Sequence, residues 1–271
     1  SLAMLNDSTR CIGCKACMVA CKRENKLERE SSLDDKEKLG HTIYDSPRGL
    51  SEQTYTVIKM HQENNKGETT FVKRQCMHCV DPACQSACIV GALKKQKSGA
   101  VQYDAGLCMG CRYCMAACPY SIPQFEWHSA IPSIRKCTLC NETRLKKGEA
   151  TACSSACPAG AITFGKRSDL LKIAKHRIED EPGRYVDHVY GEDEVGGTNV
   201  FYLAPPKAAF ASLGLPAFDY RPVSGLTESI QHRLFQYFIP PIAVYGILGG
   251  IMAYNNQRKK NGDVQGGDDD H

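Results

Sequence analysis

Cysteine is the residue type whose number and spacing in this chain could support chemistry. Sixteen of the 271 residues are cysteine, and they fall into four groups of four with none left over. The first and third groups have the spacing C-x2-C-x2-C-x3-C, the second C-x2-C-x4-C-x3-C and the fourth C-x2-C-x12-C-x3-C. The groups are Cys11, Cys14, Cys17 and Cys21; Cys76, Cys79, Cys84 and Cys88; Cys108, Cys111, Cys114 and Cys118; and Cys137, Cys140, Cys153 and Cys157.

This spacing is typical of binding sites for cubane [4Fe-4S] clusters. A cubane needs three thiolates that converge on three irons from a tight loop, and the short gaps allow that loop. The last cysteine of each group lies one helical turn further on and points toward a neighbouring cluster, so the groups should work in pairs. Pro119 and Pro158 follow two of the groups and turn the chain away from the motif. We therefore predict four [4Fe-4S] clusters, with all sixteen cysteines as metal ligands.

Other roles for the cysteines fit the pattern less well. Zinc sites normally combine two separate C-x2-C pairs, and three cysteines within residues 11–17 or 108–114 would crowd a tetrahedral ion. A disulfide framework has no reason to repeat C-x3-C in every group, and structural thiols would show no period. A zinc-binding structural module remains as a remote alternative.

Composition narrows the class of protein. Hydrophobic residues make up 42% and charged residues 24%, which excludes wholesale disorder. A mean hydropathy of -0.37 excludes a chain that is mostly embedded in a membrane. The net charge of +4 is too small to indicate a nucleic-acid partner. The chain has no glycine-rich nucleotide loop and no nucleophile paired with a base, so we expect no catalysis by the chain alone.

The elements that must position the cysteines form an internal repeat. A C-x-x-G-A-aliphatic segment follows the second and fourth groups, at residues 88–93 and 157–162. The glycine permits a tight exit from the cluster loop, and the aliphatic residue begins a short strand. We expect one such strand at 161–164, and another that pairs with residues 100–103. The fold class should be α+β.

Two further elements are predicted outside the cysteine groups. The insertion at 22–73 contains two strand-like runs, 55–60 and 69–73, which indicate a hairpin. Residues 168–178 should form a helix with Ser168 as its N-cap. Its inward face should carry Leu170, Leu171, Ala174 and Ile178.

The C-terminal part predicts a strap, a membrane-spanning helix and a polar tail. Residues 181–225 are rich in glycine and proline and should form an irregular strap. Residues 234–254 carry no charge across 21 positions, which as a helix reach about 31 Å and match a hydrocarbon core of about 30 Å. We expect one transmembrane helix within 226–256, with a buried core helix as the alternative, and a solvated tail at 257–271.

Charges beside this helix predict its orientation. Arg258, Lys259 and Lys260 follow it, against Arg221 and Arg233 before it, and positive charge stays in the cytoplasm. The prediction is a single pass through the inner membrane, with the C-terminus cytoplasmic and the cluster domain on the periplasmic side.

The cysteine groups and their flanks resemble the four-cluster ferredoxin-like subunits of respiratory complexes such as hydrogenase, formate dehydrogenase and dimethyl sulfoxide reductase. The resemblance covers most of the chain. It is carried by QCMHCVDP at 75–82, CRYCMAACPY at 111–120, KCTLC at 136–140 and PAGAITFG at 158–165. The GGT at 196–198 looks like the membrane-anchored branch, and the SIQH at 229–232 looks closest to the subunit of a hydrogenase-2 type enzyme.

This resemblance implies the fold and the ligand sets. Residues 1–180 would form two pseudo-symmetric ferredoxin-like modules with two [4Fe-4S] clusters each, in which groups exchange their last cysteines. The implied sets are Cys11, Cys14 and Cys17 with Cys157; Cys137, Cys140 and Cys153 with Cys21; Cys76, Cys79 and Cys84 with Cys118; and Cys108, Cys111 and Cys114 with Cys88. His78, Lys15 and Arg112 could raise a cluster potential, although structural or solvated roles are favoured.

The resemblance also implies a function and partners. The chain would relay electrons between a periplasmic nickel-iron hydrogenase and an integral membrane subunit that is quinone-reactive or carries cytochrome b, in contact with membrane lipid. The alternative is the beta subunit of a membrane-bound formate dehydrogenase or related molybdoenzyme; the C-terminal helix argues against a free soluble ferredoxin. Export would follow the twin-arginine route, and a chain without a signal peptide fits a mature or shortened form.

Overall fold

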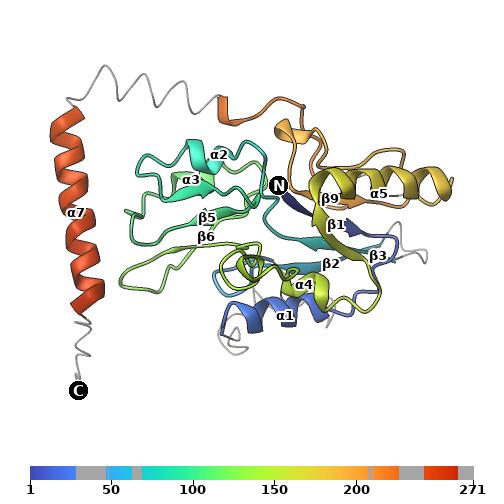
Figure 1. Cartoon of the computed structure of the whole chain (residues 1–271), viewed down its shortest axis with the longest axis horizontal. Coiled ribbons are helices and arrows are strands. Elements are labelled where there is room, and N and C mark those ends of the chain that lie inside the picture. Colours follow the sequence, from blue (N-terminus) through green and yellow to red (C-terminus); the bar gives the residue numbers. More distant parts are fainter. Residues whose placement is uncertain are drawn as a thin grey trace.

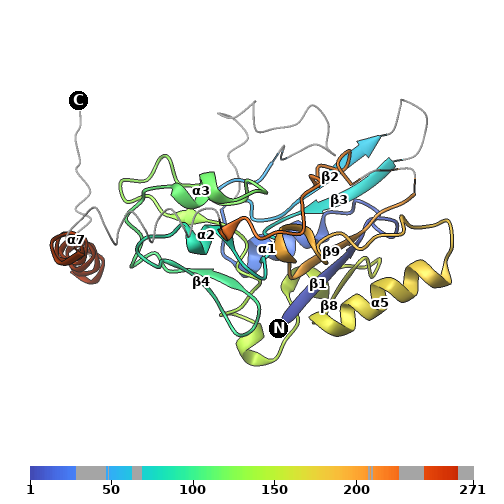
Figure 2. The same cartoon turned by 90° about the horizontal axis from the view of Figure 1, so that it is seen from above.

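The central sheet pairs the strand that precedes the first cysteine group with two strands that follow the last cysteine group. In this computed structural model, strand β1 (Leu2–Asp7) pairs antiparallel with β8 (Ile162–Lys166) and parallel with β9 (Val200–Leu203), as Figures 1 and 2 show. Met4 lies opposite both Phe164 and Val200. The structure describes residues 1–28, 47, 49–62, 69–206, 208, 210–225 and 241–261.

Strand β1 is buried on both faces because different layers cover them. Successive side chains of a strand point to opposite faces. Ala3 and Leu5 pack with the core beside helix α5 (Arg167–Asp180), whereas Met4 belongs to the larger core around the cysteine loops. This burial on both faces explains why the first four residues of the strand, 2–5, are all apolar.

Two similar units carry the cysteine groups. In the first, helices α1 (Ala16–Glu24) and α4 (Ala152–Ser155) pack together beside strands β1 and β8. In the second, two short helices pack together beside an antiparallel strand pair. Its elements are α2 (Ala83–Ser86), β4 (Leu93–Lys95), β5 (Val101–Tyr103) and α3 (Tyr113–Ala117). The predicted α+β arrangement of two ferredoxin-like modules is supported.

The predicted hairpin in the insertion is present. Strands β2 (Val57–Gln62) and β3 (Thr69–Arg74) pair antiparallel, with Val57 opposite Arg74. The turn between them lies outside the described residues. A smaller ladder joins β6 (Gln124–Phe125) to β7 (Ile134–Arg135), and two 3-10 turns lie at Leu145–Lys147 and Glu194–Gly196.

Helix α5 is present where it was predicted, but its cap differs. The helix starts at Arg167 after Lys166, which offers no side-chain cap, and the Ser168 hydroxyl inside the first turn donates to the Asp169 carboxylate at 3.1 Å. Leu170 and Ala174 are buried, as expected. Leu171 and Ile178 are half-buried and pack against the same core.

The segment expected to be an irregular strap contributes a core strand. All four residues of β9 are buried, and its parallel pairing with β1 extends the sheet. The pairing partner lies at the far end of the sequence, so the run at 200–203 could not be recognised as part of that sheet from its own pattern.

The prediction of a transmembrane helix is wrong. Helix α7 (Pro241–Asn261) lies at one end of the molecule in Figure 1, and among the described residues no helix is both long and apolar enough to span a membrane. The uncharged segment contains three glycines, and α7 then continues through the polar and basic residues 255–260. A segment without charged residues is therefore not necessarily apolar enough to span a membrane. The predicted single pass through the inner membrane, and the orientation predicted with it, are therefore wrong as well. Residues 226–240 and 262–271 lie outside the described residues.

Candidate iron-sulfur centres

The loops of the first and third cysteine groups have nearly the same backbone. Gly13 and Gly110 precede the second cysteine with φ of 69° and 78°, and Lys15 and Arg112 follow it with φ of 59° and 60°. A left-handed residue on each side of the cysteine bends the chain tightly and turns successive N–H groups inward, which creates a concavity for an anion. Lys15 and Arg112 then begin helices α1 and α3.

Backbone N–H groups beside the second, third and fourth cysteine groups point at sulfur. The N–H of Gly110 donates to Cys108 Sγ at 3.4 Å, that of Leu139 to Cys137 Sγ at 3.4 Å, and that of Ala92 to Cys88 Sγ at 3.2 Å. Such bonds stabilise thiolates and clusters, and they tune cluster potential. The donor geometry fits thiolate-bound iron-sulfur clusters.

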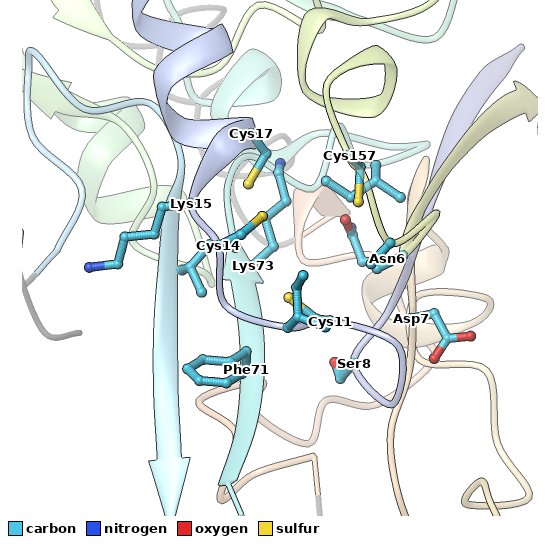
Figure 3. Close-up of a pocket in the computed structure, with 15 residues that line it drawn as sticks. Asn6, Asp7, Ser8, Cys11, Cys14, Lys15, Cys17, Phe71, Lys73 and Cys157 are labelled. Carbon is cyan, nitrogen blue, oxygen red and sulfur yellow. The ribbon is translucent and has the colours of Figure 1, made fainter.

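The last cysteine of each group lies with the first three of another group. We call the four resulting clusters of thiols the first set (Cys11, Cys14, Cys17, Cys157), the second set (Cys21, Cys137, Cys140, Cys153), the third set (Cys76, Cys79, Cys84, Cys118) and the fourth set (Cys88, Cys108, Cys111, Cys114). The first set lines one pocket, shown in Figure 3, and the fourth set lines another. In the second and third sets, the thiols are close enough to interact electrostatically.

These sets coincide with those that the family resemblance implies. Cys21 lies among Cys137, Cys140 and Cys153, although it belongs to the first group in sequence. The first and second sets belong to the module of β1 and β8, and the third and fourth to the module of β4 and β5. Ligation of iron by these particular sets stays a prediction.

Burial holds many of these thiols in the neutral form when no metal is bound. Burial is the main reason that the pKa of Cys17 and of Cys137 is raised to about 12, and that of Cys140 to about 11. Iron binds the thiolate, so cluster insertion must displace these protons. The unpaired thiolates would be costly inside the core, and cluster binding and folding are therefore coupled.

Three lysines lie beside these thiols; two are buried, and Lys95 is half-buried. Lys95 Nζ donates to the carbonyl oxygens of His78 at 2.7 Å and Cys79 at 2.5 Å. Lys136 Nζ donates to the carbonyls of Cys137, at 3.1 Å, and Val101. Because ammonium groups are rarely buried without compensation, their presence fits a core that holds negative charge.

Sequence reasoning missed Lys73, the third of these lysines. Lys73 lies on β3, is 3% exposed, and lines the pocket of the first set with Phe71. Figure 3 shows its side chain extending from the strand toward Cys17 and Cys157. Lys73 lies two residues after Phe71, so both side chains are on the same face of the strand. This spacing was the feature of the sequence that could have indicated that Lys73 faces the core.

The other candidates for tuning have structural contacts. His78 is fully buried, and its Nδ1 accepts a hydrogen bond from the Val101 N–H at 3.0 Å. Burial, together with Lys136 and Lys95, keeps its pKa well below the usual range, so the ring stays neutral. The Arg112 guanidinium stacks over Trp127, 4.9 Å from the ring centroid, and Lys15 points away from the pocket in Figure 3.

Comparison with known proteins agrees with this geometry. Residues 10–92 and residues 68–167 each match the 4Fe-4S dicluster domain family. The hydrogenase-2 operon protein HybA of Escherichia coli O157:H7 is 36% identical over 301 aligned positions, which cover 99% of this chain and 88% of HybA. The chain belongs to the family of four-cluster iron-sulfur subunits.

Two other relatives align with about three quarters of this chain. The iron-sulfur subunit of the nitrate-inducible formate dehydrogenase of Escherichia coli K12 is 37% identical over 209 positions, covering 74% of this chain and 67% of that protein. A protein of Nitratidesulfovibrio vulgaris is 45% identical over 206 positions, covering 75% of this chain but only 54% of its own length. This iron-sulfur subunit is an electron-transfer protein with four [4Fe-4S] clusters, which confirms the predicted cofactors and role and removes the zinc alternative.

Proposed function

We propose that this subunit relays electrons between a nickel-iron hydrogenase and a quinone-linked membrane subunit. The observation that carries the hydrogenase assignment is the similarity to HybA over nearly the whole of both chains. The similarity to the formate dehydrogenase subunits covers about three quarters of this chain, which makes a formate dehydrogenase the second candidate for the partner.

The cysteine sets support a linear relay. Neighbouring thiols link the first set to the second through Cys17 and Cys153, and the second to the third through Cys137 and Cys76. Cys84 lies near Cys114 and continues the series to the fourth set. When bound, each cluster supplies a one-electron redox centre, and the protein holds these centres in order.

The two ends of this series reach the surface. Cys14 in the first set and Cys111 in the fourth set are exposed, whereas the remaining described cysteines are buried or half-buried. Exposed apolar side chains flank both, with Ile12 beside Cys14 and Met109 beside Cys111. Apolar and aromatic surface of this kind is common at protein interfaces, which supports a different partner at each end.

Metal analysis of the native complex tests the proposal. A complex purified through this subunit should contain nickel and oxidise hydrogen, whereas the isolated subunit should be reducible without turning over hydrogen or formate. Molybdenum or tungsten in place of nickel would transfer the assignment to formate dehydrogenase. Turnover by the isolated chain would contradict the relay itself.

A further inference from the structure

The ammonium group of Lys73 differs from those of Lys95 and Lys136 in its hydrogen bonding. Lys95 and Lys136 each donate to two backbone carbonyls. Lys73 Nζ is buried and has no hydrogen-bond partner among the residues that the structure describes. A buried cation without an acceptor is costly, so its position needs a compensating negative charge.

The negative charge available to Lys73 comes from two cysteine sets at once. Its Nζ interacts electrostatically with Cys17 of the first set and with Cys153, Cys137 and Cys21 of the second. These cysteines carry that negative charge once they bind iron, because iron binds the thiolate form. Figure 3 shows the amine end of the Lys73 side chain beside Cys17, with Cys157 across the pocket.

The rest of the residue is held in place from the backbone. Lys73 pairs with Ile58 in the hairpin, and the hydroxyl of buried Tyr202 on β9 donates to the Lys73 carbonyl at 2.7 Å. The strand therefore cannot withdraw the lysine from the core without breaking the contact with the central sheet.

We propose that the Lys73 ammonium donates hydrogen bonds to the cluster-bound sulfur of the first and second sets and thereby raises the reduction potentials of both clusters. One-electron reduction adds a negative charge to a cluster, and a cation in a low-dielectric core stabilises that reduced state. The inference rests on the proposed ligand sets and deepens the proposed relay, because it makes the two clusters of one module respond together to one residue.

The substitution Lys73→Met tests this inference in the native complex. Methionine keeps an unbranched side chain and removes the charge. In a redox titration followed by EPR, the ratio of reduced to oxidised cluster at fixed potential should fall about tenfold for the first and second sets, a shift of about 59 mV to more negative potential for a one-electron couple. The third and fourth sets should change much less.

Lys172→Met is the matched control. Lys172 is exposed on α5 in the same module, so the variant loses the same charge from a position where water and salt screen it. Its four cluster potentials should match those of the unmodified protein. Equal shifts in the two variants, or unchanged potentials in Lys73→Met, would overturn the inference.

A second measurement needs no variant and covers the case in which Lys73→Met fails to retain clusters. In complex labelled with 15N only at lysine Nζ, which leaves the backbone nitrogens of Lys15, Lys22 and Lys136 unlabelled, pulsed EPR of the reduced protein should detect a lysine nitrogen coupled to the cluster of the first set. Absence of that coupling would overturn the inference. An error in the ligand sets can be told apart from an error in the role of Lys73, because it would appear as loss of the wrong cluster in cysteine variants. An error in the hydrogenase proposal would appear only in the metal content of the partner.

Discussion

The loop that carries the first cysteine group is anchored by one buried carboxylate. The Asp7 side chain at the end of β1 accepts hydrogen bonds from the N–H and hydroxyl of Thr9, at 3.1 and 2.6 Å, and from Tyr185 at 3.0 Å. It also pairs with Arg177 at 2.9 Å and Arg10 at 3.3 Å. A single side chain thus joins the strand, the start of the cluster loop and helix α5.

Replacing this carboxylate should loosen the first cluster site. Asp7→Asn keeps the shape but removes the charge that Arg177 and Arg10 share, so we expect a loss of about 3 kcal/mol in unfolding free energy. Urea-induced bleaching of the visible cluster absorbance should become faster. Asp180→Asn, at an exposed site on α5, should change the stability by less than about 0.5 kcal/mol. Equal bleaching of both variants would contradict this role for Asp7.

Exchange of the last cysteines makes a second prediction at the residue scale. Cys157→Ser should damage the cluster held by Cys11, Cys14 and Cys17, because Cys157 lines their pocket. Cys153→Ser should instead damage the cluster of the second set. Iron analysis and EPR of each variant would assign the lost cluster. A structure with Cys157 bound to the same cluster as Cys137 and Cys140 would refute the crossed arrangement.

At the scale of elements, the segment before β9 turns sharply to lie against that strand. Tyr190 and Tyr202 form an isolated antiparallel bridge, and Gly191 follows with a φ of 96°. Its N–H donates to the Glu194 carboxylate at 2.6 Å, and its carbonyl accepts from the Thr198 N–H at 2.8 Å. The turn brings the chain back so that β9 can join β1.

A methyl group at this turn should weaken the sheet. A Cβ on Gly191 would lie 2.5 Å from the Val200 carbonyl oxygen and 2.6 Å from Thr198 Oγ1, and the left-handed φ adds strain. We expect Gly191→Ala to lower the unfolding free energy by at least about 2 kcal/mol. Gly160→Ala is the control, since φ there is 60° but nothing lies within 4 Å, so only about 1 kcal/mol of backbone strain should appear. Coincident denaturation curves for Gly191→Ala and Gly160→Ala would show that the close contact of the added methyl group with Val200 and Thr198 is tolerated.

At the scale of the whole molecule, the core is organised around the clusters rather than around a continuous apolar interior. Cysteines from all four groups and the two buried lysines Lys73 and Lys136 occupy positions that aliphatic side chains fill in most domains. The helices that bear the thiols are short, between four and nine residues, and draw little stability from their own hydrogen bonds. The clusters therefore act as structural cross-links as well as redox centres.

A full complement of metal should accompany the folded chain. Four complete ligand sets predict about sixteen iron and sixteen sulfide per chain after anaerobic purification. Iron and acid-labile sulfide assays with EPR check the number. Iron near twelve with a three-iron signal would contradict four intact cubanes. Chelation of the iron should unfold both modules, which circular dichroism would detect as loss of the native spectrum.

What the sequence determined by itself was local. Cluster number follows from cysteine spacing, because a cubane loop is closed within a few residues, and the hairpin and helix α5 follow from patterns confined to their own segments. The predicted N-cap of α5 was wrong because β8 runs directly into the helix, so that Lys166 and not Ser168 lies at the cap position. The prediction of a transmembrane helix was wrong because a count of charges ignored the three glycines of the uncharged segment, and because α7 continues into the polar and basic residues that follow it.

The tertiary structure decided what depends on distant parts of the chain. The pairing of β9 with β1, the gathering of Cys21 with Cys137, and the approach of Lys73 to two cysteine sets all join residues far apart in sequence. A lysine in a strand is usually solvated, and only the packing of the hairpin against the cluster loops buries this one. Burial and electrostatic environment are properties of the assembled core, so no spacing rule along the chain could reveal them.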